Sequence, residues 1–313
     1  MVYYMGGKAA HASEILSFAL AKRERGQAWV EPFVGGGNVI CRVPPEQGLR
    51  IGSDTNWRMI ALLDALGNKG WQPPETVTEK EYNRIKKDPD SVAPELAAFV
   101  ATGLSFGSKW FDVFARDAEG TDRTRIARAR AIADAPGLKG CTFIACSYDQ
   151  INSRIPSNSI IYCDPPYTGT SEYAGAKTKI KLGESLAKNI WRVGAFWKWA
   201  DALVDEGHHV FVSEYIGPPA SNYDGWTPEL KTESSELRVA YRASADDPTS
   251  LASQREWLSL KITDVDQRVS ANAEVKAARW KCLWEKEVVS DFSSQKESGA
   301  VKKEIERLYH REP

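Results

Sequence analysis

The residues with the clearest capacity for chemistry are the four from Asp164 to Tyr167, which read Asp-Pro-Pro-Tyr. Asp164 supplies a carboxylate, Pro165 a backbone carbonyl in a stretch that two prolines make rigid, and Tyr167 an aromatic face. This set suits a planar heterocycle with an amino group, because the oxygens can accept hydrogen bonds from the NH2 group while the ring stacks. The alternative is a strand-terminating turn without a ligand.

The apolar run Ser159–Cys163 directly precedes these residues. A run of this length followed by a turn predicts a buried parallel strand that ends in a loop. In an open α/β sheet, ligands bind outside the carboxyl ends of the strands. The sequence therefore places Asp164 at the edge of a sheet where a ligand would bind.

A glycine-rich turn follows a second short strand, within the stretch Trp29–Ile40. Glycines 35 to 37 allow a tight turn and a close approach of backbone N–H groups to a ligand. A further strand, Leu49–Ile51, leads to Asp54, which stands 19 residues after the first of these glycines and can hydrogen-bond a ribose hydroxyl. Ile40 occupies the position at which a dinucleotide fingerprint requires glycine, so a mononucleoside fits better. The alternative is a structural glycine turn with a solvated Asp54.

Four segments of the chain together resemble the DNA adenine methyltransferases of the Dam type. In this resemblance the glycine-rich turn belongs to the cofactor site, and it precedes the catalytic Asp-Pro-Pro-Tyr tetrapeptide. The similarity includes phage-encoded relatives, and the order of the segments is that of the α group of amino-methyltransferases. The four segments are Tyr4–Lys8, Glu31–Gly37, Ser53–Asn56 and Ile161–Tyr167. Phage-type members are also similar at Ser105–Phe111, Val212–Tyr215 and Glu306–Tyr309.

The resemblance implies S-adenosyl-L-methionine as the cofactor. It places eight residues around that cofactor: Tyr4, Lys8, Glu31, Phe33, Gly35, Gly37, Asp54 and Asp164. Lys8 would face the methionine carboxylate, Asp54 the ribose, and Asp164 the region between the cofactor and the base. Tyr4 stands where Dam relatives commonly have tryptophan. An aromatic ring is kept, so this difference affects only how strongly the ring would stack on the cofactor.

Catalysis is assigned by the same resemblance to Asp164, Pro165 and Tyr167. The exocyclic nitrogen of adenine is a poor nucleophile because its lone pair is delocalised into the ring. If the Asp164 carboxylate accepts one N–H and the Pro165 carbonyl accepts the other, the nitrogen can direct its lone pair outward, and transfer then needs positioning more than acid–base chemistry. Tyr167 would stack on the adenine, which contributes ~1–3 kcal/mol against a base-flipping cost of a few kcal/mol.

We therefore expect a site-specific methyltransferase that acts on N6 of a flipped-out adenine in double-stranded DNA. One alternative is an enzyme for another amine, such as cytosine N4, RNA or a protein amide, although the aspartate that begins the tetrapeptide favours adenine by resemblance. The second alternative is a DNA-binding relative without catalysis. The presence of Lys8, Asp54 and Asp164 argues against that alternative.

Two basic clusters are candidates for contact with DNA. The formal net charge is −1, so any nucleic-acid surface must be local. The first cluster comprises Lys109, Arg116, Arg123, Arg125, Arg128 and Arg130, and the second comprises Lys177 and Lys179. Their positions before and after the catalytic tetrapeptide favour phosphate contacts, whereas the alternative for each cluster is a solvated face.

Strand and helix signals alternate along the chain, which predicts an α/β protein with a Rossmann-like, doubly wound and mostly parallel sheet. We assign residues 1–66 and 139–313 to the catalytic domain and residues 67–138 to an inserted helical target-recognition domain. Four aromatic residues of that insert either contact DNA or form a small helical core: Phe106, Trp110, Phe111 and Phe114. A further insertion at about 217–280 is either an added recognition element or a tolerated surface insertion.

Composition limits the class of protein. The chain has 313 residues, 42% of them hydrophobic, which is enough for a core in about two domains. No stretch approaches the ~18 apolar residues of a membrane span, and no leader is visible, so we expect a cytoplasmic monomer or weak dimer without a membrane partner. Five cysteines without a Cys-x-x-Cys pair indicate reduced thiols and no metal site. His208 and His209 are predicted to be a surface pair rather than metal ligands.

Overall fold

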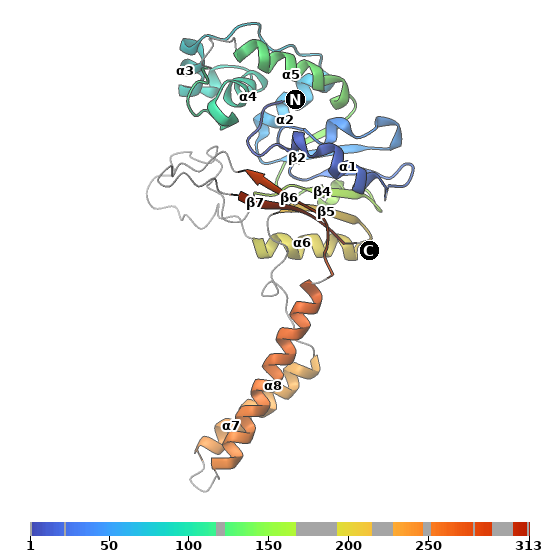
Figure 1. Cartoon of the computed structure of the whole chain (residues 1–313), viewed down its shortest axis with the longest axis vertical. Helices are drawn as coiled ribbons and strands as arrows, with labels where there is room; N and C mark the ends of the chain where they lie inside the picture. Colours follow the sequence, from blue (N-terminus) through green and yellow to red (C-terminus); the bar gives the residue numbers. More distant parts are fainter. Residues whose placement is uncertain are drawn as a thin grey trace.

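A seven-stranded sheet with the order β3-β2-β1-β4-β5-β7-β6 forms the centre of the computed structural model (Figure 1). The structure describes residues 2–21, 23–116, 123–166, 193–214, 228–246, 252–277, 279–289, 303–311 and 313. The strands are β1 (Trp29–Glu31), β2 (Arg50–Asp54), β3 (Thr142–Ala145), β4 (Ile160–Cys163), β5 (His209–Glu214), β6 (Lys281–Val289) and β7 (Lys303–Arg311). Strands β1 to β5 are parallel, and β7 is antiparallel to both β5 and β6. The predicted α/β class with a mostly parallel sheet is therefore confirmed, and this arrangement is compatible with a Rossmann-like fold.

Alternate residues of the central strands enter two hydrophobic cores, one on each face of the sheet. Trp29 and Tyr162 belong to the core that helices α1, α2, α4 and α5 complete. Val30 and Ile161 belong to the second core, which α6 covers. Because side chains alternate along a strand, burial on both faces requires the continuous apolar runs that these strands have.

The helices are α1 (Ala12–Ala21), α2 (Trp57–Asn68), α3 (Glu79–Lys87), α4 (Pro94–Gly103), α5 (Arg123–Leu138), α6 (Val193–Asp205), α7 (Pro228–Asp246) and α8 (Ala252–Ala277). Local sequence sets several of their ends. The Asn56 side chain accepts a hydrogen bond from the Met59 N–H at the start of α2, and Thr78 and Glu81 form a capping box at the start of α3. Both devices satisfy backbone donors that the first helical turn leaves unpaired.

Helices α3, α4 and α5 lie at one end of the molecule, beyond α2 (Figure 1). Tyr82 of α3 lies edge-to-face with Phe111 and Phe114, at 6.0 and 5.3 Å between ring centroids. Trp110 packs in the same way against Phe111 at 5.6 Å. Phe106, in contrast, is 64% exposed. Three of the four aromatic residues predicted for this insert therefore contribute to a small helical core.

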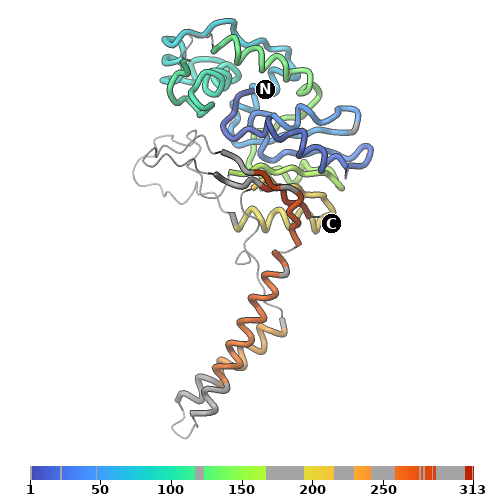
Figure 2. The backbone as a smooth tube through the Cα atoms, viewed as in Figure 1, coloured from blue at the N-terminus to red at the C-terminus, as the bar shows by residue number. Residues whose placement is uncertain are grey.

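Helices α7 and α8 pack against each other and project from the sheet on the side opposite to α3–α5 (Figures 1 and 2). Leu258 and Val265 of α8 are buried in this helical arm. Arg268 Nη2 lies 2.7 Å from Glu233 Oε1, so an ion pair also joins the two helices. The described part of the insertion at about 217–280 is thus a helical hairpin, a form that the sequence analysis did not predict.

The prediction of a surface histidine pair is wrong for His208. This residue is buried, and its Nδ1 accepts a hydrogen bond from the Ser159 N–H at 3.0 Å. Burial lowers the pKa of His208. His208 directly precedes β5 and Ser159 directly precedes β4, so this hydrogen bond joins the starts of two neighbouring strands. His209, the next residue, is partly exposed. Within the described part of the chain, no helix is long and apolar enough to cross a membrane.

Candidate functional site

The candidate site lies where β1 and β4, neighbours in the sheet, both end. Their register pairs Val30 with Ile161, so Glu31 at the end of β1 lies beside the end of β4, which Asp164 follows. The strand order continues to β2 on one side and to β5 on the other. A reversal of this kind opens a crevice outside the carboxyl ends of the strands, which is where open α/β sheets bind ligands.

An ion pair joins Lys8 to Asp164 at this edge. Lys8 Nζ lies 2.9 Å from Asp164 Oδ1, and the two side chains are 7% and 20% exposed. The same ammonium donates a hydrogen bond to the Gly6 carbonyl at 3.0 Å. Lys8 begins the short 3-10 helix η1 (Lys8–Ala10), which follows the glycine pair and turns the lysine inward. Because the pair is nearly buried, loss of either partner would leave a poorly solvated charge.

Glu31 adds a second carboxyl group that is fully buried. The Trp29 indole Nε1–H donates a hydrogen bond to Glu31 Oε1 at 2.8 Å. Burial raises the pKa of Glu31 to about 8; the Trp29 hydrogen bond opposes this rise, and the charge of Asp164 adds to it. At neutral pH the group of Lys8, Asp164 and Glu31 therefore holds one cation, one anion and one carboxyl that is mostly protonated.

Asp54 fixes the glycine turn to the end of β2. Its Oδ2 accepts a hydrogen bond from the Gly35 N–H at 3.0 Å, and its Oδ1 accepts one from the Asn56 N–H at 2.8 Å. Burial raises the pKa of Asp54, although the backbone donors act against this. Gly35 and Gly37 have φ values of +48° and +69°, a region that favours glycine. The Thr55 backbone also donates to this carboxylate. A carboxylate offers about four acceptor positions, so a hydroxyl group of a ligand could also bind there.

The segment of residues 2–8 covers the glycine turn. A Cβ atom at Gly35 would lie 2.9 Å from the Tyr4 ring, and one at Gly36 would lie 2.8 Å from Tyr4 Cβ. A Cβ atom at Gly7 would lie 2.6 Å from Asn38 Nδ2. A side chain at any of these positions would have to displace Tyr4 or Asn38. The structure therefore brings Tyr4 against the glycine turn, and its contact with a cofactor stays a prediction.

Asn38 is a site residue that the sequence analysis missed. The residue is only 6% exposed, and its Oδ1 is buried with no hydrogen-bond partner among the described residues. An unpaired buried acceptor is costly, so the Asn38 oxygen is a candidate acceptor for a hydrogen bond from a ligand. The sequence did contain a clue to this residue. Asn38 directly follows three glycines, and a polar side chain next to residues without side chains is able to reach the same space.

Phe33 lies in an aromatic cluster that connects the β1 turn to α6. Its ring stacks on Tyr148 at 5.4 Å between centroids and meets Phe196 edge-on at 5.8 Å. Trp199 extends the cluster through an edge contact with Tyr148 at 5.0 Å. Phe33 is thus anchored at the position that the resemblance gives to a cofactor contact, and Tyr148 and Trp199 were not recognised from the sequence.

Most of the basic residues predicted to contact DNA have protein partners in the structure. Arg116 forms three hydrogen bonds with Glu79: its Nη2 lies 2.5 Å from Oε1 and 2.6 Å from Oε2, and its Nε lies 3.2 Å from Oε2. Lys109 Nζ lies 4.0 Å from Asp112 Oδ2. Arg128 Nε donates a hydrogen bond to the Pro73 carbonyl at 2.9 Å. The remaining arginines of the cluster are on α5: Arg123, Arg125 and Arg130.

These partners use part of the donor capacity of each cation, and contact with DNA stays a prediction. Tyr167, Lys177 and Lys179 lie outside the described residues. Pro165 is buried directly after Asp164, so the tetrapeptide is described as far as Pro166.

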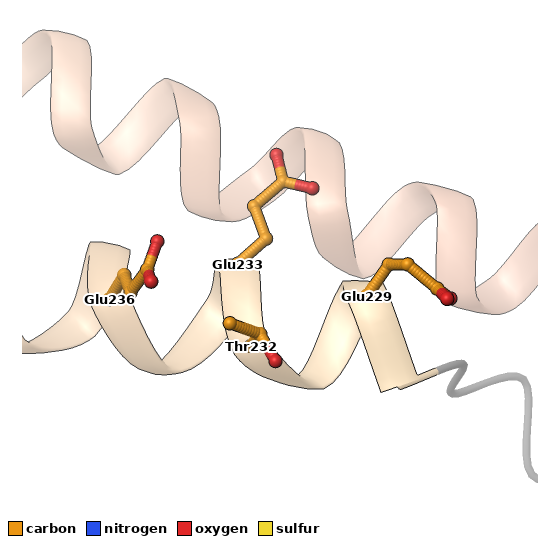
Figure 3. A pocket seen from close by; sticks show the side chains of 4 residues that line it. All are labelled: Glu229, Thr232, Glu233 and Glu236. Carbon is orange, nitrogen blue, oxygen red and sulfur yellow. The ribbon is translucent and has the colours of Figure 1, made fainter.

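A surface hollow lies on α7 (Figure 3), in the arm that projects away from the sheet (Figure 1). Its lining residues are Glu229, Thr232, Glu233 and Glu236. Glu233 is paired with Arg268, as described above for the helical arm. The hollow contributes nothing to the site around Asp164.

No protein-family model matches the chain, and no curated protein sequence matches it either. The chemistry of the residues that the fold brings together is therefore the basis on which function is inferred.

Proposed function

We propose that the protein is an S-adenosylmethionine-dependent methyltransferase that acts on N6 of adenine in DNA. The observation that carries the proposal is the convergence of Lys8, Glu31 and Asp164 at the reversal point of the sheet, next to a glycine turn that Asp54 holds. The order of the motifs along the chain and a mostly parallel sheet compatible with a Rossmann-like fold support this proposal.

The residues of the site fit a nucleoside that carries an amino-acid group. Tyr4 packs on the glycine turn, so its ring would lie beside a nucleoside bound there, while Asp54 offers carboxylate oxygens to ribose hydroxyls. The buried Asn38 Oδ1 has the character of an acceptor for an ammonium or hydroxyl group. Lys8 supplies a cation for a carboxylate. When bound, the cofactor supplies an electrophilic sulfonium methyl group.

The role of Asp164 is to hold and orient the amine of the base. Its carboxylate, together with the Pro165 carbonyl, can accept the two N–H groups of an exocyclic amine and so free the nitrogen lone pair. Lys8 fixes the orientation of this carboxylate from the opposite side. Such an arrangement contributes through positioning and electrostatics, without a residue that must act as a general base.

Two experiments test the proposal in sequence. Calorimetry of the purified protein in the presence of a chelator should show binding of S-adenosylmethionine or its demethylated product, and binding of NAD alone would exclude this cofactor. Sequencing of DNA and RNA from cells that express the chain should then show N6-methyladenine in DNA at a defined site. Methylation found on cytosine N4 or only on RNA would assign the site to another amine, and no methylation at all would contradict enzymatic activity.

A further inference from the structure

Tyr3 lies between two arginines of α5. The guanidinium carbon of Arg123 lies 4.4 Å from the centroid of the Tyr3 ring, and that of Arg130 lies 4.2 Å from it. Residues seven positions apart are two turns apart on a helix and therefore lie on the same side of it. Both contacts have the geometry of a cation–π interaction.

A third contact fixes the same segment to α5. The Val2 N–H donates a hydrogen bond to Asp134 Oδ2 at 2.7 Å, and the Val2 side chain is buried in the main core. Asp134 follows Arg130 by four residues, so Arg123, Arg130 and Asp134 form one face of α5 directed at residues 2 and 3. Residues 2 and 3 are thus held by α5 rather than by the sheet.

The other end of this segment reaches the proposed catalytic residue. Tyr4 packs on the glycine turn, and Lys8 forms the ion pair with Asp164. Between Tyr3 and Lys8 the Gly7 N–H donates to the Tyr4 carbonyl at 3.1 Å, which closes a tight turn. A short, structured stretch of chain therefore connects the arginine helix to Asp164.

We propose that Tyr3 is a positioning residue that couples the occupancy of Arg123 and Arg130 to the order of the site around Lys8 and Asp164. The inference rests on the proposed function. Stacking engages the flat face of a guanidinium, whereas phosphate binds to its in-plane N–H groups. Phosphate contacts from nucleic acid would therefore hold both arginines against Tyr3 instead of displacing it. The segment of residues 2–8 then becomes more ordered, and the cofactor binds more tightly when DNA is present.

The test is the coupling between DNA and S-adenosylhomocysteine, measured as the ratio of the cofactor Kd without and with a mixed-sequence DNA duplex. We expect the duplex to lower this Kd about fivefold or more in the wild-type protein, within the usual range of coupling between sites. Tyr3→Leu, which removes the aromatic ring, should bind the duplex with unchanged affinity and show a ratio near one. Tyr3→Phe, which keeps the ring, should restore the wild-type ratio, and a merely structural hydroxyl role would not give this pattern.

The double variant Arg123→Lys with Arg130→Lys provides a second route if Tyr3→Leu does not fold. Lysine keeps the charge for phosphate, but an ammonium that turns to a phosphate leaves the Tyr3 ring, whereas a planar guanidinium can stack on the ring and donate in its plane at the same time. This variant should bind DNA and lose the coupling. Coupling that persists in either variant, or a ratio near one in the wild-type protein, would overturn the inference. Failure of the wild-type protein to bind the cofactor at all would instead refute the proposed function.

Discussion

Lys8 Nζ lies 2.9 Å from Asp164 Oδ1, so the segment of residues 2–8 and the residue that follows β4 are joined directly. If Asp164 orients the amine of the base, Asp164→Ala should abolish methyl transfer, and its loss of cofactor affinity should be much smaller than its loss of turnover. Tyr167→Ala should reduce turnover less, because it removes stacking but not the acceptor. Methyl transfer to DNA measured with a radiolabelled methyl donor gives both values. Near-normal turnover by Asp164→Ala would show that the proposed mechanism is wrong.

The same ion pair predicts an effect on stability. Asp164→Ala leaves the Lys8 ammonium buried without its carboxylate partner, which should lower the free energy of unfolding by about 3 kcal/mol. Combining it with Lys8→Met removes the isolated charge, so the double variant should recover most of this loss in urea unfolding. Methyl transfer should stay absent in the double variant. If the single variant Asp164→Ala and the double variant were equally unstable, the isolated Lys8 charge would not be the cause of the lost stability.

Glu31 predicts a specific dependence of stability on pH. Its pKa is about 8 in the folded protein, raised mainly by burial above the ordinary value of 4.5. Because the folded state holds this proton more tightly, the stabilising contribution is complete below about pH 4.5 and is lost as pH rises towards 8. The free energy of unfolding of the wild-type protein should therefore fall, relative to that of Glu31→Gln, between these two pH values.

The expected size of this effect is several kcal/mol, since each unit of pKa shift corresponds to about 1.4 kcal/mol. Urea unfolding of both proteins at pH 5 and pH 8 measures it. Glutamine is the matched control because its side-chain oxygen can still accept the Trp29 hydrogen bond. Parallel pH profiles for the two proteins would contradict the raised pKa of Glu31.

Gly35→Ala should abolish cofactor binding. A Cβ atom there would lie 2.9 Å from the Tyr4 ring, and the φ of +48° is itself unfavourable for alanine. Gly70→Ala is the matched control, because Gly70 has a similar φ of +67° but nothing within 4 Å of the added Cβ. Both variants should lose about 1–2 kcal/mol of stability from the backbone conformation, and only Gly35→Ala should lose the cofactor in calorimetry. If the Gly35→Ala and Gly70→Ala variants bound the cofactor with equal affinity, the glycine turn would not be part of the cofactor site.

Replacing the four arginines of α5 by alanine should weaken DNA binding and flatten its salt dependence. The structure shows Arg123 and Arg130 against Tyr3 and Arg128 bonded to Pro73, so the four side chains do not share one surface. The slope of log K against log salt should therefore change by roughly two units rather than four, at about 0.9 per phosphate contact. Arg268→Ala, in the arm, is the control and should leave the slope unchanged. If the slope were unchanged in the quadruple variant, the arginines of α5 would not contact DNA phosphates and would only face solvent or the protein.

Local features of the chain were predictable from sequence because their causes are local. Apolar runs predict buried strands, and β1, β4 and β5 form where such runs occur. Glycines 35 and 37 adopt the positive φ values that their turn needs. The resemblance placed Glu31 and Asp164 around one cofactor, but only the structure shows that β1 and β4 are neighbours and therefore end side by side at one edge of the sheet.

Long-range pairing was decided by the tertiary structure. Lys8 and Asp164 are 156 positions apart, and no local pattern states that this lysine, among many, forms the ion pair. The placement of Tyr3 between two arginines and the burial of His208 depend in the same way on which surfaces the fold brings together. The α7–α8 arm was missed for a related reason. The two helices are rich in polar residues and have few apolar ones, so the sequence shows no clear apolar face. Those few apolar residues are buried only because the partner helix packs on them.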